Sequence, residues 1–285
     1  MASSNKAAAT YVAKKKIAKQ TTDAASKAKT TPQPKPKPPS PHSWEGSYLA
    51  EDHEHGCVNR HISAYTPSNR CSHRHQARLK AQQTPEKYTW PEDAPRQPDS
   101  PGEWDLEGDG NFQTNASTPF AHEAHHIVAN AELMAAVIDT GEGIEPKDRI
   151  PLIVRSGLMR EGYNINNQTN MIILPMVRYA ALALGLPLHR RTFSHFHHAT
   201  YSTYIKQELL SLFSWIKKAA DAHKVPDYEN TREAVEQLSK NVRPQIVAAG
   251  EAMKAGNMDG DALEDIPHDF LRQGRPQDSM SGSPP

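Results

Sequence analysis

Apolar residues recur at steps of three and four along the segment from His195 to about His223. This spacing places them on one face of a helix, and it predicts a long amphipathic helix with a buried stripe. The residues on this face are His198, Tyr201, Ile205, Leu209, Leu212 and Ile216. Burial of this stripe is expected to set the orientation of the helix. The helix is therefore expected to hold the imidazoles of its first turn in a defined direction.

Shorter patterns predict further elements from about residue 119 onward. Apolar residues within 131–139 recur at helical spacing, and Asn130 is placed to cap the helix that they predict. The apolar run Met-Ile-Ile-Leu at 171–174 follows a turn-like stretch and predicts a short strand. Three more helices are predicted over 145–159, 176–184 and 231–253. The predicted fold class is α+β and mostly helical, with the last of these helices folded back as a cover.

Composition separates this compact region from long flanks. The 285 residues include 23 prolines and 36% hydrophobic residues, which indicates one compact domain rather than a chain folded throughout. Low hydrophobicity and high charge predict disorder in the basic arm and in the acidic stretch that ends at residue 118. The predicted parts are a basic arm with a proline-rich linker at 1–43, a His/Cys-rich accessory segment at 44–80, an acidic linker at 81–118, the compact domain at 119–225, and a helical cover with a disordered tail at 226–285.

Charge and apolar runs limit the classes to which the chain can belong. The formal net charge is zero because basic and acidic segments cancel, so it says little about partners. No apolar run approaches the roughly 20 residues of a membrane-spanning helix, and no membrane span is expected. The N-terminus also lacks the apolar core of a secretory signal, so export is expected to use a route that does not read one.

Residues 44–80 carry cysteines and histidines in a nearly mirrored pattern, H-x-H-x-C and then C-x-H-x-H after thirteen residues. Thiolates and imidazoles in two such groups are ligands that zinc accepts in a tetrahedral structural site. The six candidate ligands are His53, His55, Cys57, Cys71, His73 and His75. The same pattern fits a single disulfide or a merely polar segment. Two cysteines make no disulfide framework, so a reducing cytosol is the default compartment.

Two more histidine groups concentrate the chemistry of the compact domain. Their members are His122, His125 and His126, and about seventy residues later His189, His195, His197 and His198. Neutral imidazoles bind first-row metals, and a histidine of near-neutral pKa is a suitable general base. Adjacent histidines at a strand end point to opposite sides, so one can face a metal while the other faces water. His195 and His198 are three apart, so on a helix they can converge on one ion.

The run between the two histidine groups, from Tyr163 to Asn170, is rich in asparagine. Asn170 comes directly before the predicted strand, where its side chain is expected to bind backbone or the base imidazole and hold the loop closed. The order His-His, Asn, His therefore combines a cation site, a base and a rigid frame. Phosphodiester hydrolysis needs these three parts.

The segment Ala124-His125-His126-Ile127-Val128 resembles the signature of the AHH nucleases, a toxin branch of the HNH/endonuclease VII superfamily. The resemblance covers roughly residues 119–216 and implies a ββα-metal (His-Me finger) core to which further helices are added. Later features of the family appear in order: a Gly-x-Asn-x-Asn-like stretch at 162–166, Asn170 before a strand that ends Leu174-Pro175, and His198-x-x-Tyr201.

The resemblance also implies roles for individual residues. His125 is expected to be the first metal ligand, His126 the general base and Asn170 the middle asparagine of the motif. His195 and His198 are expected to be the ligands from the helix. The ion is expected to be divalent, with Mg²⁺, Mn²⁺ and Zn²⁺ as the candidates.

Accessory residues complete the predicted site. Late histidines of the family often flank a Gly-Ser pair that this chain lacks, so His197 competes with His195 as a ligand. The other candidates are His122 and His189 as accessory ligands, Tyr201 as a packing residue whose hydroxyl supports an imidazole, and Arg178, Arg190 and Arg191 as contacts to the nucleic-acid backbone.

The predicted function is that of a metal-dependent nuclease toxin that hydrolyses DNA with little sequence specificity. By its resemblance, the protein is expected to act in interbacterial competition, through a contact-dependent or type VI-like secretion component, with a cognate immunity protein. It would lie in the producer's cytoplasm and be delivered to the target-cell cytoplasm. Two alternatives remain: a non-catalytic, zinc-stabilised module that binds nucleic acid or protein, and the same nuclease acting on RNA.

Overall fold

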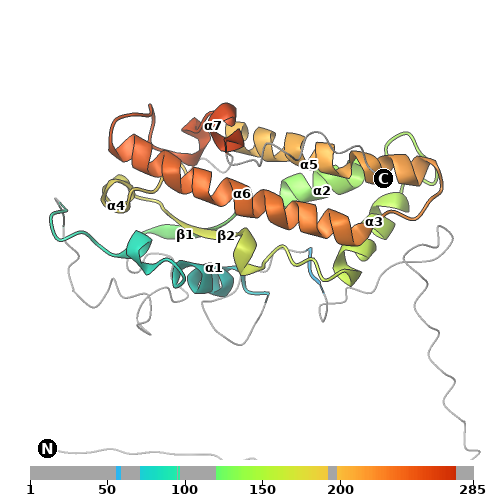
Figure 1. Cartoon of the computed structure of the whole chain (residues 1–285), viewed down its shortest axis with the longest axis horizontal. Helices are drawn as coiled ribbons and strands as arrows, with labels where there is room; N and C mark the ends of the chain where they lie inside the picture. The colour runs from blue at the N-terminus through green and yellow to red at the C-terminus, as the bar shows by residue number, and fades with distance from the viewer. Residues whose placement is uncertain (1–55, 59–70, 95, 97–119, 192–197, 274–285) are drawn as a thin grey trace, which may run out of the picture. The chain divides into compact units, whose positions relative to one another are not determined.

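The computed structural model describes residues 56–58, 71–94, 96, 120–191 and 198–273, all within the compact unit Pro38–Pro285 (Figure 1). The predicted disorder of the basic arm, of most of the acidic linker and of the last residues of the tail lies outside the described residues. The candidate ligands His53, His55, His195 and His197 also lie outside them.

An antiparallel pair of strands forms the sheet of the described part of the chain. β1 (His122–His126) pairs with β2 (Met171–Pro175) so that His125 faces Ile172 and His126 faces Met171. The predicted strand at 171–174 is therefore confirmed. Because side chains alternate along a strand, His125 and Ile172 lie on one face of the sheet, and His126 and Met171 lie on the other.

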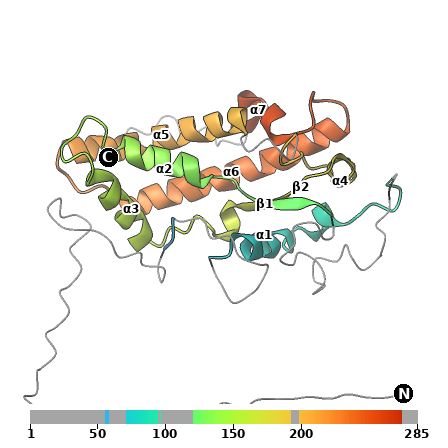
Figure 2. The same ribbon diagram turned by 180° about the vertical axis from the view of Figure 1, so that it is seen from behind.

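Helices cover both faces of this sheet. Figures 1 and 2 show the two strands between α1 on one side and α6 with α5 on the other. Ile172 and Leu174 pack into the larger core with α2, α3, α5 and α6, while Met171 and Ile173 pack with α1 and α4. The helices are α1 (His73–Ala81), α2 (Asn130–Asp139), α3 (Ile150–Arg160), α4 (Arg178–Leu184), α5 (Ala199–Asp221), α6 (Tyr228–Lys254) and α7 (His268–Arg272), with 3₁₀ turns η1 (Pro85–Tyr88), η3 (Gln168–Asn170) and η4 (Leu263–Asp265). The predicted mostly helical α+β fold is confirmed.

α5 follows the predicted apolar stripe, but it begins later than predicted. Tyr201, Ile205 and Leu209 on the stripe are buried. His198 is the N-cap, and its backbone angles (φ −101°, ψ 71°) lie outside the helical region, so the helix starts at Ala199. His198 therefore lies outside the helix that was predicted to hold it, and His195 lies outside the described residues.

Two other helix starts also differ from the prediction. Asn130 does not cap α2, because its side chain donates a hydrogen bond to the carbonyl oxygen of Val58 at 2.6 Å. α3 begins at Ile150 rather than 145, and Pro151 occupies its first turn, where a missing N–H costs little. Both differences arise from contacts and turns that helical periodicity does not report.

The folded core extends beyond the predicted compact region in both directions. Tyr88 and Trp90, in the stretch predicted to be an acidic linker, are buried with Ala77 of α1 against the sheet. At the other end, α6 packs on α3, α4 and α5, and α7 packs on α6. Part of the tail predicted within 226–285 is therefore folded, with Leu263 buried in the main core. None of the described helices has the length and apolar character needed to cross a membrane.

The packing of α6 against the segment after α4 can be tested at Gly250. A Cβ at this position would lie 2.5 Å from the carbonyl oxygen of Gly185 and 2.5 Å from Cα of Leu186. Helix propensity alone would stabilise Gly250→Ala by about 1 kcal/mol, but forcing backbone atoms apart costs roughly 1–3 kcal/mol. We expect a net loss in the free energy of unfolding, measured by urea denaturation.

The exposed position Ala248 in the same helix provides the control for that measurement. Ala248→Gly removes helix propensity without a packing change, so it is expected to cost about 1 kcal/mol. A Gly250→Ala protein more stable than wild type would contradict the close approach of α6 to Gly185.

Candidate metal centre

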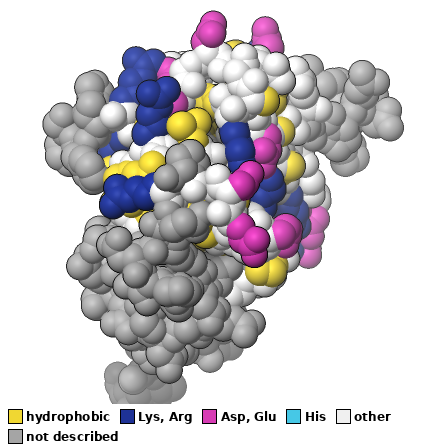
Figure 3. All heavy atoms as spheres, turned by 90° about the vertical axis from the view of Figure 1, so that its left-hand side faces the viewer, with side chains coloured by type: hydrophobic (Ala, Val, Ile, Leu, Met, Phe, Trp, Pro, Cys, Tyr) yellow, Lys and Arg dark blue, Asp and Glu magenta, His cyan; other side chains and the backbone are white. Residues whose placement is uncertain are grey.

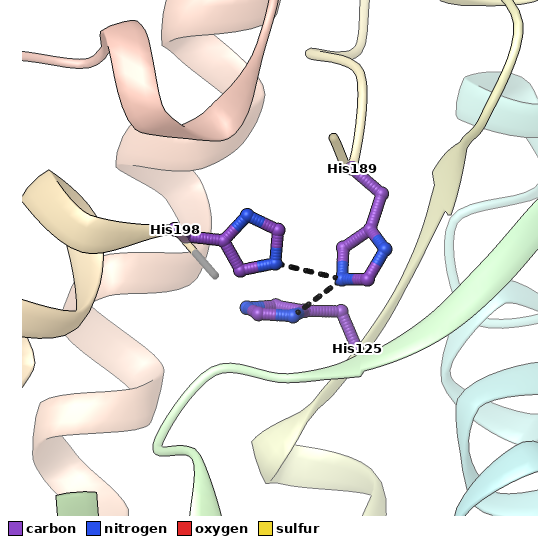
Figure 4. A group of neighbouring side chains, drawn as sticks. All are labelled: His125, His189 and His198. Atoms are coloured by element: carbon purple, nitrogen blue, oxygen red, sulfur yellow. Dashed lines mark hydrogen bonds between the residues drawn. The ribbon is translucent and has the colours of Figure 1, made fainter. Parts of the chain in front are cut away.

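Three histidine side chains from separate elements converge beside the sheet (Figure 4). His125 comes from β1, His189 from the loop after α4, and His198 from the N-cap of α5. His125 Nδ1 lies 3.0 Å from His189 Nε2, and His198 Nε2 lies 3.1 Å from the same nitrogen. All three donor nitrogens lie within 4.8 Å of one another.

This donor set fits one metal ion. Nitrogens bound to a tetrahedral zinc at about 2.0–2.1 Å are roughly 3.3 Å apart, close to the separations found here. Two imidazole N–H groups directed at one lone pair make a poor hydrogen-bonding arrangement, whereas three lone pairs directed at one cation satisfy every nitrogen. Among the described residues, these three form the one group of three or more histidines, cysteines and acids able to hold a metal.

Glu123 fixes the orientation of His189. The Nδ1–H of His189 donates to Glu123 Oε2 at 2.9 Å, which leaves the lone pair on Nε2, the atom that faces His125 and His198. Arg190 forms an ion pair with the same carboxylate. Arg190 Nε also lies 3.3 Å from His189 Nδ1, but the shorter, charge-assisted bond to Glu123 decides the tautomer. Carboxylates of this kind orient metal-binding histidines in many sites.

The partners of Glu123 also keep it ionised. Burial raises the pKa of Glu123, but hydrogen bonds and charges from His189 and Arg190 outweigh burial and hold the pKa at about 2. The carboxylate is therefore negative throughout the neutral range. A negative charge behind His189 increases the electron density on its Nε2 and favours a bound cation.

The fold places these residues through backbone contacts. His189 N donates to the carbonyl oxygen of Pro175 at 2.8 Å, which ties the loop to the end of β2. Glu123 and His125 share one face of β1, as alternation requires. Tyr201 packs its ring against His125 with centroids 5.5 Å apart, and its hydroxyl donates to the carbonyl oxygen of Ile127 at 2.7 Å. The predicted support of an imidazole by this hydroxyl is therefore wrong.

His126 points to the opposite face of β1 from His125. Its Nε2 lies 3.0 Å from Asn166 Oδ1, and its ring stacks on His73 of α1 with centroids 5.2 Å apart. Asn166 Nδ2 donates to Cys57 Sγ at 3.8 Å, which turns the amide so that Oδ1 faces His126. His126 therefore carries its proton on Nε2, and its lone pair lies on Nδ1.

Asn170 binds backbone rather than an imidazole. Its Oδ1 accepts from Val128 N at 2.7 Å and from Ser239 Oγ at 2.8 Å, while Nδ2 donates to the carbonyl oxygens of Val128 and Ile165. The side chain thus ties the turn after β1 to the asparagine-rich loop and to α6. This arrangement holds the end of the His125-His126 strand in place.

Other candidates lie away from the three-histidine group. His122 is on the opposite face of β1, where its Nδ1 lies 2.6 Å from the Phe120 carbonyl oxygen and burial lowers its pKa to about 4. Cys57 and Cys71 are buried and are not joined by a disulfide, so the disulfide alternative for this segment is wrong. Within the described part of the predicted zinc set, Cys57, Cys71, His73 and His75 contribute no group of three close ligands.

The three candidate arginines are held by carboxylates. Arg190 binds Glu123, Arg178 Nε lies 3.3 Å from Asp261 Oδ2, and Arg191 binds Glu264 and Asp265. On the face drawn in Figure 3, basic side chains lie close to acidic ones and no histidine is visible among the described residues. Arg178 and Arg191 therefore fasten the C-terminal segment, and Arg190 alone of the three lines the cavity described next.

A cavity of about 430 Å³ opens over the histidines. His125, His189 and His198 line it, and His126 borders it from the other side of β1. The first turn of α2, residues 129–132, and Ser202 in the first turn of α5 form the remaining wall with Glu123 and Arg190. A metal ion bound by the three histidines would therefore be accessible to a molecule in the cavity, with a second imidazole close by.

Residues 106–243 match the model of AHH, a nuclease family of the HNH/ENDO VII superfamily with conserved AHH. Over these residues the chain is similar to the AHH nuclease family. The match covers just under half of the chain and contains every residue of the three-histidine group. Searches of the curated proteins and of the solved structures gave no match. Enzymes of the AHH family are nucleases that hydrolyse phosphodiester bonds, and nucleases of this superfamily are metal-dependent.

Sequence reasoning missed several residues of the nuclease site. Glu123 was not predicted as a site residue. Its spacing of two residues from His125 is the signal that could have found it, because on a strand this spacing places both side chains on one face. His189 was predicted only as an accessory, because it follows a helix and lies in no periodic pattern. Asn166 belongs to the Gly-x-Asn-x-Asn-like stretch, but the sequence does not show that Asn166, and not Asn170, is the asparagine that contacts His126.

The role of Glu123 can be tested through metal affinity. Glu123→Gln removes the charge behind His189 and weakens the selection of its tautomer, so we expect the affinity for Zn²⁺ to fall about 10–100-fold. Isothermal titration calorimetry measures this directly. The matched control is Glu229→Gln at an exposed position in the first turn of α6, which should bind Zn²⁺ as wild type does. Equal affinities in the two variants would contradict the orienting role of Glu123.

Proposed function

We propose that this AHH nuclease is a toxin that hydrolyses DNA, using one divalent metal ion held by His125, His189 and His198. The observation that carries the proposal is the convergence of these three imidazoles, with His189 oriented by Glu123, on the cavity that His126 also borders. His126 is the general base. This assignment extends the metal-dependent nuclease activity of the family to particular residues of the chain.

The metal ligands, His126 and Asn170 have separate roles in hydrolysis. A bound divalent ion would polarise a phosphate oxygen and neutralise charge that develops on the phosphate. His126, with its proton on Nε2 toward Asn166, takes a proton from water through its Nδ1 lone pair. A correctly placed base of this kind contributes roughly 10²–10⁴ in rate. Asn170 keeps the strand end rigid, so that His126 and the metal ligands keep their relative positions.

The electrostatics of the cavity favour a phosphate that arrives together with a metal. Glu123 and Glu132 line the cavity and would repel an anion, and Arg190 offsets only part of this charge. The first turns of α2 and α5 open into the same space without side-chain caps, and helix N-termini attract anions. Because the groups that would be contacted are phosphates rather than bases, little sequence specificity is expected.

Imidazole donors favour particular ions. Three histidine nitrogens suit zinc and other first-row metals, while Mg²⁺ prefers oxygen ligands. We therefore expect Zn²⁺ or Mn²⁺ to support activity at lower concentrations than Mg²⁺. Three protein ligands also leave a coordination position for a phosphate oxygen, as in catalytic zinc sites.

The biological setting is proposed on the resemblance to the toxin branch of the superfamily. In that setting the chain acts in interbacterial competition, is exported by a contact-dependent or type VI-like secretion component, and reaches the target-cell cytoplasm. A cognate immunity protein would protect the producer. The cavity over the histidines is the surface that such a protein would need to cover in order to block hydrolysis.

A plasmid assay tests the catalytic proposal. Wild type with Mn²⁺ or Zn²⁺ should nick and degrade supercoiled plasmid DNA, and a chelator should stop the reaction. His126→Ala should lower the rate by about 10²–10⁴ and keep its metal, because His126 lies outside the three-histidine group. The exposed His223, at φ 51°, offers a matched control, since His223→Asn suits that backbone conformation and should cleave as wild type does.

The outcomes separate the remaining substrates and functions. A His126→Ala protein as active as wild type would remove His126 as the base. Structured RNA offered beside duplex DNA decides between DNA and the alternative RNA substrate. A purified, metal-loaded wild type that cleaves neither would favour a binding module in place of the proposed activity.

A further inference from the structure

We propose that His73 is a positioning residue for His126. The segments 56–58 and 71–81, upstream of the family match, hold the ring of this general base in one orientation. This inference rests on the proposed role of His126. It assigns a function to His73 and Cys57 of the accessory segment, which lie outside the family match.

His73 fixes the plane of the His126 ring. The two rings are stacked, with centroids 5.2 Å apart and 24° between their planes. His73 is 1% exposed, so the contact lies in the interior. α1 is fixed by Ser72, whose Oγ accepts from His75 N at 3.3 Å, and by Ala77 and Ala81, which are buried against the sheet. Because these contacts anchor α1, the helix holds the ring of His73 against the face of the His126 ring.

Asn166 and Cys57 fix the rotation of the same ring within its plane. Asn166 Oδ1 binds His126 Nε2 at 3.0 Å, and Asn166 Nδ2 donates to Cys57 Sγ at 3.8 Å. An amide with both ends engaged cannot turn over without losing contacts. The ring of His126 is thus held by a stack on its face and a hydrogen bond at its edge, which together define its orientation.

The backbone of the upstream segment 56–58 is hydrogen-bonded to the asparagine-rich loop. Cys57 N donates to the Tyr163 carbonyl oxygen at 2.8 Å, and Ile165 N donates to the Cys57 carbonyl oxygen at 2.8 Å. Gly56 is closely surrounded, since a Cβ there would lie 2.4 Å from the Met159 carbonyl oxygen. These contacts hold the asparagine-rich loop from outside the family match and set the position of Asn166.

The stack of His73 on His126 serves packing of the interior, and it also fixes the orientation of a reacting ring. Packing alone predicts that a change at position 73 lowers stability and leaves kcat unchanged. Positioning has a catalytic consequence, because displacement of a reacting group by about 1 Å can lower the rate by about 10²-fold. The two explanations differ in which kinetic parameter changes.

The test compares His73→Ala with His73→Phe in the full-length, metal-loaded protein. On a fluorescent DNA duplex, His73→Ala is expected to lower kcat about 10–100-fold, with KM and Zn²⁺ affinity within about twofold of wild type. His73→Phe restores a flat ring and should recover most of kcat. Ala248→Gly, which costs stability at an exposed position of α6 outside the segments 56–58 and 71–81, serves as the stability control and should keep kcat.

A readout that does not depend on activity accompanies the kinetics. In protein with ¹⁵N-labelled histidine, the ring nitrogens of His126, identified by their loss in His126→Ala, should report a single tautomer protonated on Nε2. Asn166→Ala should convert this to a mixture of tautomers, and His73→Ala should shift the same signals. These spectra report how the ring of His126 is held, whether or not the protein cleaves DNA.

The outcomes are distinguishable. If wild type cleaves and His73→Ala matches its kcat, or if Ala248→Gly loses as much kcat as His73→Ala, the positioning role of His73 is wrong. If wild type does not cleave, the proposed function fails, and the spectra alone decide whether His73 and Asn166 hold the ring. Unchanged His126 signals in both variants would overturn the inference in either case.

Discussion

The register of β1 on β2 is the constraint on which the site depends. Pairing of His125 with Ile172 directs His125 and Glu123 toward α5 and directs His126 toward α1. A slip by one residue would exchange the two faces and bury His126 where the metal ligands meet. Asn170 secures this register, because its side chain joins the turn after β1 to the loop before β2.

Parts of the fold and site that follow from local periodicity could be predicted from the sequence. The stripe of α5, the strand β2 and the adjacency of His125 and His126 each have a spacing that determines a face. His189 and Glu123 could not be assigned in this way, since their roles arise from the approach of a loop to a strand. The start of α5 at Ala199 likewise depends on His198 leaving the helical conformation to join two other histidines.

The boundary of the folded nuclease also differs from the boundary that composition indicates. Residues rich in polar and charged side chains were predicted as separate segments, yet Tyr88 and Trp90 are buried against the sheet. A few buried side chains are enough to fold a polar stretch onto an existing core, and average composition does not register them. Cys57 and Cys71, two of the candidate zinc ligands, accept hydrogen bonds from the side chains of Asn166 and Asn164.

X-ray absorption at the zinc edge, on full-length protein loaded with one equivalent of Zn²⁺, tests the central claim most directly. The account predicts three imidazole nitrogens at about 2.0–2.1 Å, completed by oxygen, and no sulfur ligand. Sulfur scattering at about 2.3 Å, or fewer than three imidazoles, would place the ion elsewhere and contradict a metal centre built from His125, His189 and His198.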